Sequence, residues 1–269
     1  MKNFTIALAF LTALSLPVMA QDFQKGVEAY NAGDFATAFK EISPLAEAGS
    51  AFAQFNLALL YRDGHGVPQD DKEAAKWFRL AAEKGLAEAK YSLGLMYLKG
   101  IGVPQDDKEA VKWYRLAAEQ GYAPAQTELG LMHNNGRGVP QDHKEGAKWY
   151  RLAADQDFAR AQFNLSNSYY EGKGVIQDYK ESVKWLRQAA EQGYSGAQVN
   201  LAFMHENGKG VPQDNATAHM WYNIAAANGD EKGGTNRDNL TNKMTTAAIE
   251  KAQAMARECM NSGYKKCGY

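Results

Sequence analysis

The sequence predicts an all-α protein, an α/α solenoid of 36-residue helix-turn-helix repeats. The stretch Gly64–Asp70 returns at 100–106, 136–142, 172–178 and 208–214, and its first glycines are 36 residues apart, as 100 − 64 and 136 − 100 both give. Between these copies, apolar residues recur at intervals of three and four, which is the spacing of a helix. A fixed period of this kind indicates stacked units that bury a shared core.

The first 20 residues have the features of a secretory signal peptide. A Met1-Lys2 head precedes the apolar run 4–18, and small residues stand at Val18 and Ala20. We expect cleavage after Ala20, and an exported protein that is periplasmic or secreted from a bacterium. No later stretch reaches about 18 continuous apolar residues, so no membrane span is expected.

The charge of the chain excludes one class of partner. The formal net charge is −1, and 45% of the residues are hydrophobic. Such a chain has material for a packed core but no basic field, so nucleic acid is not an expected partner.

Residues 21–49 are predicted to form an N-terminal capping helix pair, broken at 31–34 and closed at Gly49. This pair lacks the repeated loop, as a terminal unit should. Five full units follow, at 50–85, 86–121, 122–157, 158–193 and 194–229.

Each full unit carries two apolar helical stripes. In the second unit the first helix shows Ala89, Leu93, Gly94 and Tyr97, at i, i+4, i+5 and i+8. The second helix shows Ala110, Trp113, Tyr114 and Ala117, at i, i+3, i+4 and i+7. One tryptophan recurs in every second helix. A ligand cage is one interpretation of this series, but the tryptophans share the period of the alanines, which favours core packing.

The repeated loop has its own chemistry. Its first glycine is expected to end a helix in the left-handed conformation, and proline then prevents the helix from resuming. Asp106 and Glu109 have the spacing of a capping box, in which each side chain accepts a backbone amide. In the fifth copy Thr217 replaces the glutamate, so a weaker cap is expected there. A phosphate-binding loop is disfavoured because no strand precedes the glycines.

Several positions depart from the repeat. Asp157 replaces the glycine that closes the second helix in the other units. A left-handed conformation costs such a residue about 1 kcal/mol, so the joint is expected to be looser or differently shaped. Ile176 replaces the loop proline. His133 and His205 stand in a column otherwise filled by tyrosine, either as core residues or as pH-responsive or metal-binding ones.

Residues 230–269 leave the repeat. A polar helix is expected near 237–243 after Gly233-Gly234, and a longer capping helix should begin at Thr245 or Thr246. In an oxidising compartment Cys259 and Cys267 are expected to form a disulfide, with a two-thiol metal site as the alternative.

These patterns resemble the Sel1-like repeat family, which is related to tetratricopeptide repeats. The resemblance rests on Ala89, Leu93-Gly94, Tyr97, the loop 100–106 and the second-helix residues through Gly121. It implies a right-handed superhelix whose first helices line a concave face for a protein or peptide partner, in an adaptor of the envelope, of signalling or of host interaction. The family shares no single activity.

Partner-facing residues are expected beside the packed stripe of each first helix. They are Phe55, Tyr91, Leu95, Leu98, Leu131, Asn134, Phe163, Asn167, Tyr170 and Phe203. The alternative is that much of this set packs internally. A structural envelope protein without a diffusible ligand is a further possibility.

The alternative function is a β-lactamase-like hydrolase, as described for cysteine-rich Sel1-type proteins. Ser262 and Lys265 match the minimal serine–lysine pattern of penicillin-recognising enzymes. The chain has neither of the accompanying motifs and no cysteine before Cys259. The sequence therefore favours a non-enzymatic scaffold, with no catalytic residue, metal or cofactor expected.

Overall fold

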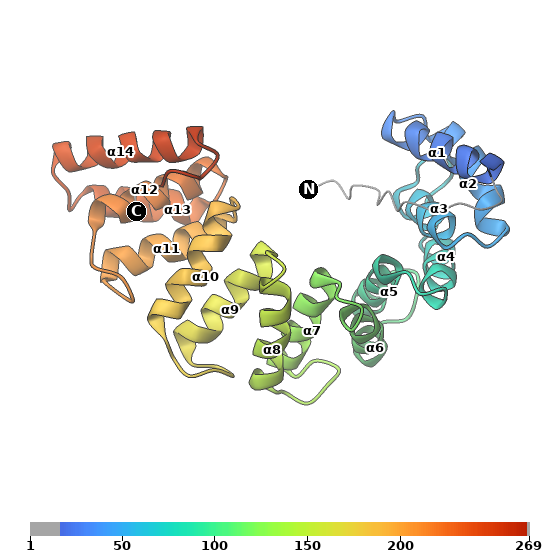
Figure 1. The fold of residues 1–269 in the computed structure, drawn as a ribbon, viewed down its shortest axis with the longest axis horizontal. Coiled ribbons are helices and arrows are strands. Elements are labelled where there is room, and N and C mark those ends of the chain that lie inside the picture. The colour runs from blue at the N-terminus through green and yellow to red at the C-terminus, as the bar shows by residue number, and fades with distance from the viewer. Residues whose placement is uncertain (1–16, 268–269) are drawn as a thin grey trace. The chain divides into compact units, whose positions relative to one another are not determined.

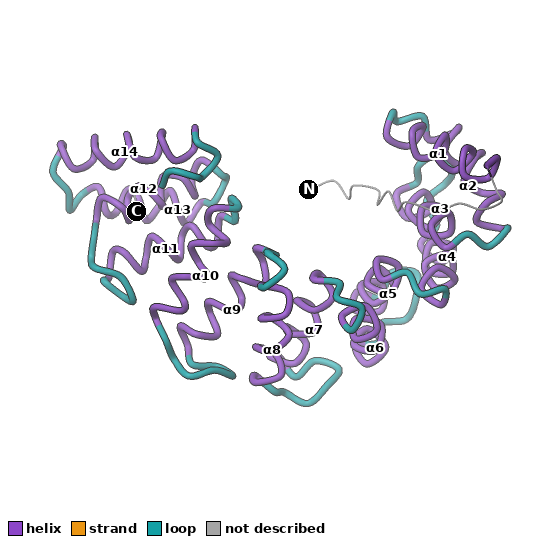
Figure 2. The backbone as a smooth tube through the Cα atoms, in the orientation of Figure 1, coloured by secondary structure: helices purple, strands orange, loops and turns teal. Residues whose placement is uncertain are grey.

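The computed structural model describes residues 17–267, and that range is helical, with turns between the helices (Figure 1, Figure 2). The helices of this range are α1 (Pro17–Asn31), α2 (Phe35–Glu47), α3 (Ala51–Asp63), α4 (Asp71–Glu83), α5 (Ala87–Lys99), α6 (Asp107–Ala118), α7 (Ala123–Asn135), α8 (His143–Ala154), α9 (Ala159–Glu171), α10 (Tyr179–Glu191), α11 (Ser195–Asn207), α12 (Asn215–Ala227), α13 (Glu231–Thr241) and α14 (Thr246–Asn261). Successive helices pack in pairs, so the predicted α/α solenoid is confirmed. Residues 1–16 of the expected signal peptide lie outside this range.

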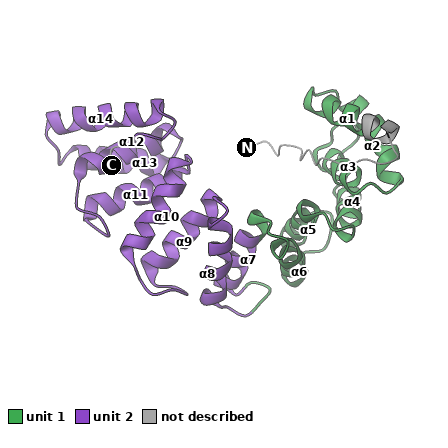
Figure 3. Ribbon diagram, in the orientation of Figure 1, with its two compact units in different colours: residues 1–125, 137–139 green, residues 126–136, 140–269 purple. Residues whose placement is uncertain are grey.

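The chain divides into two compact units (Figure 3). Unit 1 comprises residues up to 125 together with 137–139, and unit 2 comprises 126–136 and 140–269. Each unit has its own buried apolar core. No helix of the described range is long and apolar enough to cross a membrane.

The packed columns are those that the period predicted. Leu93 and Tyr114 are fully buried, and a Cβ added to Gly94 would lie 2.8 Å from the Tyr114 ring. The small residue on the first helix therefore makes room for the aromatic residue of the second helix. Trp113, Trp149 and Trp185 are at most 8% exposed and Trp221 is fully buried, so core packing is confirmed for these four.

The second glycine of each loop has a role that the sequence analysis missed. Gly102 has φ +69°, and a Cβ there would lie 2.0 Å from the carbonyl oxygen of Asp71, at the start of the preceding second helix. The corresponding glycine of the first loop, Gly66, lies in the same way against Phe35, the first residue of α2. Since Phe35 precedes Asp71 by 36 residues, the opening helix pair stacks in the register of the repeats.

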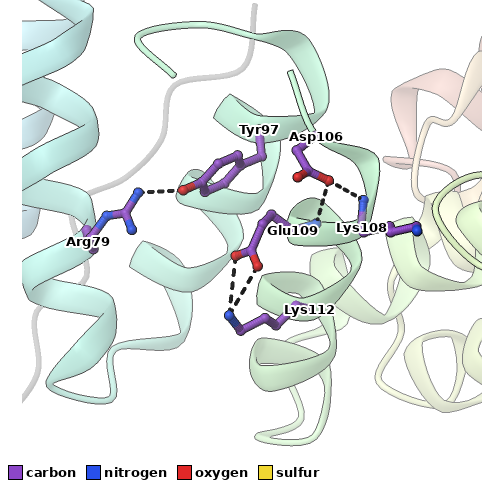
Figure 4. Close-up of polar contacts among 6 residues, drawn as sticks. All are labelled: Arg79, Tyr97, Asp106, Lys108, Glu109 and Lys112. Atoms are coloured by element: carbon purple, nitrogen blue, oxygen red, sulfur yellow. Dashed lines mark hydrogen bonds and ion pairs between the residues drawn. The ribbon is translucent and has the colours of Figure 1, made fainter. Parts of the chain in front are cut away.

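The aspartate caps form, but the capping boxes do not. Asp106 Oδ1 accepts the amides of Lys108 at 2.9 Å and Glu109 at 3.1 Å (Figure 4). The amide of Asp106 already donates to the carbonyl of Tyr97, 3.0 Å away, so Glu109 has no free donor to reach. Its carboxylate binds Lys112 at 3.2 Å instead. The predicted reciprocal bond is therefore wrong.

The cap of the fifth repeat has more hydrogen bonds than expected. Asp214 Oδ1 accepts the amides of Ala216 and Thr217 at 2.9 and 3.2 Å. The Thr217 hydroxyl also donates to Asp214 Oδ2, 2.7 Å away. The prediction of a weaker cap is wrong, because threonine supplies a donor where glutamate has none.

Asp157 adopts the predicted left-handed conformation, with φ 64°. Its carboxylate, however, joins consecutive units. Oδ1 accepts the Nε2 of Gln162 at 2.9 Å and the Nε2 of Gln192 at 3.2 Å. These bonds offset the cost of the backbone conformation, so the expected looseness of this joint is not what the contacts indicate.

The first helix of the C-terminal segment begins earlier than predicted. Helix α13 begins at Glu231, not near 237, and runs through both glycines. Gly233 follows the buried Ala197 by 36 residues, and a Cβ there would lie 2.8 Å from the Ala225 Cβ. The glycine is thus the small packing residue of another first helix. Helix α14 begins as predicted, with Thr245 as its N-cap.

The predicted disulfide is present. Cys259 and Cys267 are joined with an S–S distance of 1.96 Å, and both side chains are buried. The bond ties the end of the described chain to the last turn of α14.

Candidate functional site

All ten predicted partner-facing residues lie on the first helices α3, α5, α7, α9 and α11, and each is partly exposed. Phe203 is the most open of the large apolar ones, at 38%. Leu59 precedes Leu95 by 36 residues and Thr127 follows Tyr91 by 36 residues. These two side chains are 3% and 0% exposed and belong to the core. We call the ten partner-facing residues, four in unit 1 and six in unit 2, the first-helix face.

Three hollows lie between consecutive first helices. The α3–α5 hollow, of about 320 Å³, includes Tyr91 and Leu95. The α7–α9 hollow, of about 300 Å³, includes Leu131, Asn134 and Asn167. The α9–α11 hollow, of about 250 Å³, brings together Asn167, Tyr170 and Phe203. Phe55, Leu98 and Phe163 line none of these three.

The aromatic members of the first-helix face are partly engaged in packing. The ring centroid of Phe55 lies 5.5 Å from that of Phe78, and the centroids of Tyr91 and Tyr114 are 5.7 Å apart. Phe163 packs on Tyr194 at 5.2 Å, not on a second-helix ring. These rings therefore contribute to stacking as well as to the surface, and their removal affects both.

A lysine lies at the edge of the α9–α11 hollow. Lys209 Nζ donates to the Tyr170 hydroxyl at 2.6 Å and lies 4.8 Å from the centroid of that ring. The Phe203 ring lies 5.3 Å away. The hydrogen bond to Tyr170 raises the pKa of Lys209, so its ammonium stays charged at neutral pH.

The tyrosine column that contains the two histidines has partners which sequence reasoning missed. The guanidinium of Arg79 donates to the Tyr97 hydroxyl (Figure 4), and that of Arg151 donates to the Tyr169 hydroxyl. The arginine precedes its tyrosine by 18 residues in both cases. The constant offset was a signal available in the sequence.

His133 and His205 are buried, each 8% exposed. Burial lowers the pKa of His205, the nearby Arg187 lowers it further, and Asp214 acts in the opposite direction. The imidazole is therefore neutral at neutral pH. Among the described residues, no group of three or more His, Cys, Asp or Glu is placed to hold a metal ion.

His219 is a further buried histidine. It is 1% exposed within α12, and its Nε2 lies 3.0 Å from Thr241 Oγ1. Burial lowers its pKa, with a further contribution from the charge of Arg237. It takes a core position because α13 covers that side of α12.

A buried glutamine column joins neighbouring helices and was not predicted. Gln54, Gln162 and Gln198 each donate from Nε2 to a carbonyl eight residues earlier, at 3.0 to 3.4 Å. Gln198 Oε1 accepts a hydrogen bond from Nδ2 of Asn228, the C-cap residue of α12, at 2.9 Å. The column satisfies backbone carbonyls at helix ends, which is the reason for its 36-residue period.

The serine–lysine pattern is used in a turn. The Ser262 hydroxyl donates to the carbonyl of Cys259 at 2.7 Å and accepts the amide of Lys265 at 3.1 Å. This is a helix-ending arrangement, and no contact joins the hydroxyl to the lysine amine. Nothing in this geometry favours a hydrolase.

Comparison with known proteins agrees with the repeat geometry. The family model for the Sel1 repeat matches residues 51–86, 87–122, 123–158, 159–194 and 195–230. These segments begin one residue later than the units set by the period. No match was found among curated protein sequences.

Solved structures with the same fold include a Sel1 repeat protein from Oxalobacter formigenes. It is 31% identical, with a TM-score of 0.78, and the match covers 92% of this chain and 98% of that one. An immunity protein from Pseudomonas aeruginosa is similar at 21% identity and a TM-score of 0.51, covering 81% and 85% of the two chains, and indicates the fold alone. The five matches of the Sel1 repeat model and the similarity to the Oxalobacter formigenes protein show that the chain belongs to the Sel1 repeat family.

Proposed function

We propose that this Sel1 repeat protein is an exported, non-enzymatic scaffold that binds a protein or peptide along the first-helix face. Repeats of this family generally mediate protein interactions. The observation that carries the proposal is the partial exposure of apolar and aromatic side chains on this face, beside hollows between first helices. Apolar surface that borders grooves is typical of sites for extended peptides or partner helices.

Export is supported by two features. The N-terminal sequence has the pattern of a signal peptide, and the Cys259–Cys267 disulfide suits an oxidising compartment. We further propose that α1–α2 and α13–α14 cap the ends of the stack, and that the first-helix face is concave, as the family resemblance implies.

Capture from bacterial envelope extracts tests the proposal. The bait is the purified chain, and the variant replaces three partly exposed apolar residues, Leu95, Leu131 and Phe203, by alanine. We expect retention of specific partners, measured by quantitative mass spectrometry, to fall at least about tenfold, since central apolar contacts carry most binding energy. The thermal unfolding midpoint is measured alongside.

The matched control is Leu152→Ala, because Leu152 is 42% exposed on a second helix, outside the first-helix face. This variant should retain the partners. Unchanged capture by the triple variant, or equal loss with Leu152→Ala, would refute the proposed binding surface.

A further inference from the structure

Residues that depart from the repeat columns meet at the α9–α11 hollow. Leu186 occupies the position of an aromatic residue in the other four repeats, namely Phe78, Tyr114, Tyr150 and Tyr222. Ser182 stands where the other repeats have alanine or glycine, and Asn167 stands where the first three have leucine. All three line the hollow. Since the repeated residues specify stacking, departures gathered at one place point to a separate role.

Leu186 makes its part of the lining of this hollow aliphatic, whereas the α3–α5 and α7–α9 hollows have an aromatic residue at the equivalent position, Phe78 and Tyr150. In the second repeat the equivalent residue, Tyr114, is fully buried, and its ring centroid lies 5.7 Å from that of Tyr91. Leu186 lacks the ring and hydroxyl of a tyrosine, and the hollow of about 250 Å³ lies against it. Met204 and Phe203 complete an apolar lining, which suits an aliphatic side chain.

Polar groups in the hollow suit a peptide backbone. Ser182 is 1% exposed, and its hydroxyl has no hydrogen-bond partner within the described residues. Such an unsatisfied group is unusual in a buried position. On the wall, Asn200 Nδ2 donates to Asn167 Oδ1 at 3.2 Å, and an amide pair of this kind retains further donors and acceptors.

Lys209 gives the hollow its charge preference. No carboxylate lies within ion-pair distance of its ammonium in the part of the chain that the structure describes. The residues at the same loop position of the two preceding repeats do have carboxylate partners: Arg137 Nε lies 2.7 Å from Asp107, and Lys173 Nζ lies 2.6 Å from Glu171. The Lys209 charge is thus fixed beside the hollow without an internal counter-ion.

We propose that the α9–α11 hollow binds an extended peptide segment in which an apolar side chain is followed by an acidic residue. The apolar side chain lies against Leu186 and Phe203, the backbone bonds to Asn167 and Asn200, and the carboxylate pairs with Lys209. This inference rests on the proposed function and names the class of segment that unit 2 selects.

An array of synthetic peptides tests the preference. Each peptide has capped ends and a Gly-Ser background, with Leu, Ile, Met or Phe followed at the next or second position by Asp, Asn or Lys. We expect the purified chain to bind Asp peptides about tenfold more tightly than their Asn counterparts, because Asn loses the charge-assisted hydrogen bond to Lys209. Lys peptides should bind least, because their charge has the same sign as that of Lys209. Dissociation constants are measured by fluorescence anisotropy.

Three variants assign the effect to the hollow. Lys209→Gln should bind Asp and Asn peptides equally, whereas the matched control Lys173→Gln should keep the tenfold preference, since that lysine is already paired. Leu186→Tyr installs the residue of the second, third and fifth repeats, so it should fold with an unchanged circular dichroism spectrum. Its ring should take the place of the bound apolar side chain and abolish peptide binding.

Several outcomes would overturn the inference. They are equal binding of Asp and Asn peptides, an unchanged preference for Asp in Lys209→Gln, and full peptide binding by folded Leu186→Tyr. Self-association of the chain that Lys209→Gln abolishes would also overturn it, because the hollow would then hold a second copy of the chain. If the array fails while the triple alanine variant still loses its captured partners, only the peptide class is wrong. If that variant captures normally, the proposed function itself fails.

Discussion

The second and fourth repeats share a backbone but differ in what fills the space between their helices. Helices α5 and α9 both end at a left-handed glycine, Gly100 with φ 67° and Gly172 with φ 72°. Their second helices begin with the same aspartate cap. Yet the second repeat has the fully buried Tyr114 where the fourth has Leu186, which lines a hollow of about 250 Å³. Backbone geometry is fixed by few residues, so the remaining columns are free to vary.

The largest expected effect concerns what the two repeats have in common. Gly102→Ala and Gly174→Ala each place a Cβ within 2.0 Å of a carbonyl oxygen at a positive φ. We expect each to lower the free energy of unfolding by about 3 kcal/mol, from steric collision plus left-handed strain. Urea unfolding followed by circular dichroism measures both.

Gly121→Ala is the matched control for these glycines. Its φ is also positive, at +88°, but nothing lies within 4 Å of the added Cβ. Only the conformational cost of about 1 kcal/mol should appear. If all three variants lose the same stability, backbone approach is not what the second glycine provides.

The next effect exchanges the residues by which the repeats differ. Tyr114→Leu removes a fully buried ring and should cost about 2 kcal/mol in unfolding free energy through the cavity it leaves. Leu186→Tyr adds atoms where a hollow exists and should cost less than about 1.5 kcal/mol. Urea titrations compare the two, and equal losses would mean that the hollow is not available space.

The 36-residue period determines how much of the fold could be predicted from the sequence. Side chains that repeat every 36 residues gave the helices, the buried stripes and the first-helix face. Gly233 was misplaced because a glycine pair was interpreted as a break, although the same register counted from Ala197 assigns it to a packed column. Glu109 was misassigned because the amide it was expected to accept already bonds Tyr97, a contact between helix and loop that spacing does not reveal.

The candidate site was predictable in outline only. Its residues lie on the expected helices, but the linings of the hollows also include second-helix residues such as Leu186, and Phe163 packs on Tyr194, which lies outside the first helices. The pairing of Lys209 with Tyr170 spans 39 residues and depends on loop geometry. These are tertiary contacts, which column patterns within one helix do not encode.

A smaller effect concerns the joint before the fourth repeat. Asp157→Ala keeps the left-handed backbone but loses the bonds to Gln162 and Gln192, so it should cost about 1 kcal/mol. Asp157→Gly loses the same bonds and relieves the strain, so it should lie within about 0.5 kcal/mol of the native chain. Urea unfolding separates them, and a glycine variant as unstable as the alanine variant would contradict the compensation.

The smallest effect concerns the column in which the second and fourth repeats have Tyr97 and Tyr169 and the fifth repeat has His205. His205 has its pKa lowered by burial, so the unfolded chain binds a proton more readily than the folded chain does. Stability is therefore undiminished above the ordinary pKa of 6.5 and falls as the pH drops below it. His205→Tyr removes this loss and places a phenol 18 residues after Arg187, as in the Arg79–Tyr97 pair.

The measurement is the urea midpoint at about pH 7.5 and about pH 5, for the native chain and for His205→Tyr. The variant should lose less stability on acidification, and the remaining loss includes His219, whose pKa is also lowered and which the variant keeps. His143→Tyr is the control, since that residue is partly exposed at the start of α8. If His205→Tyr loses as much stability on acidification as the native chain, the buried imidazole of His205 carries no pH-dependent penalty. The fifth repeat would then tolerate histidine in this column as well as tyrosine.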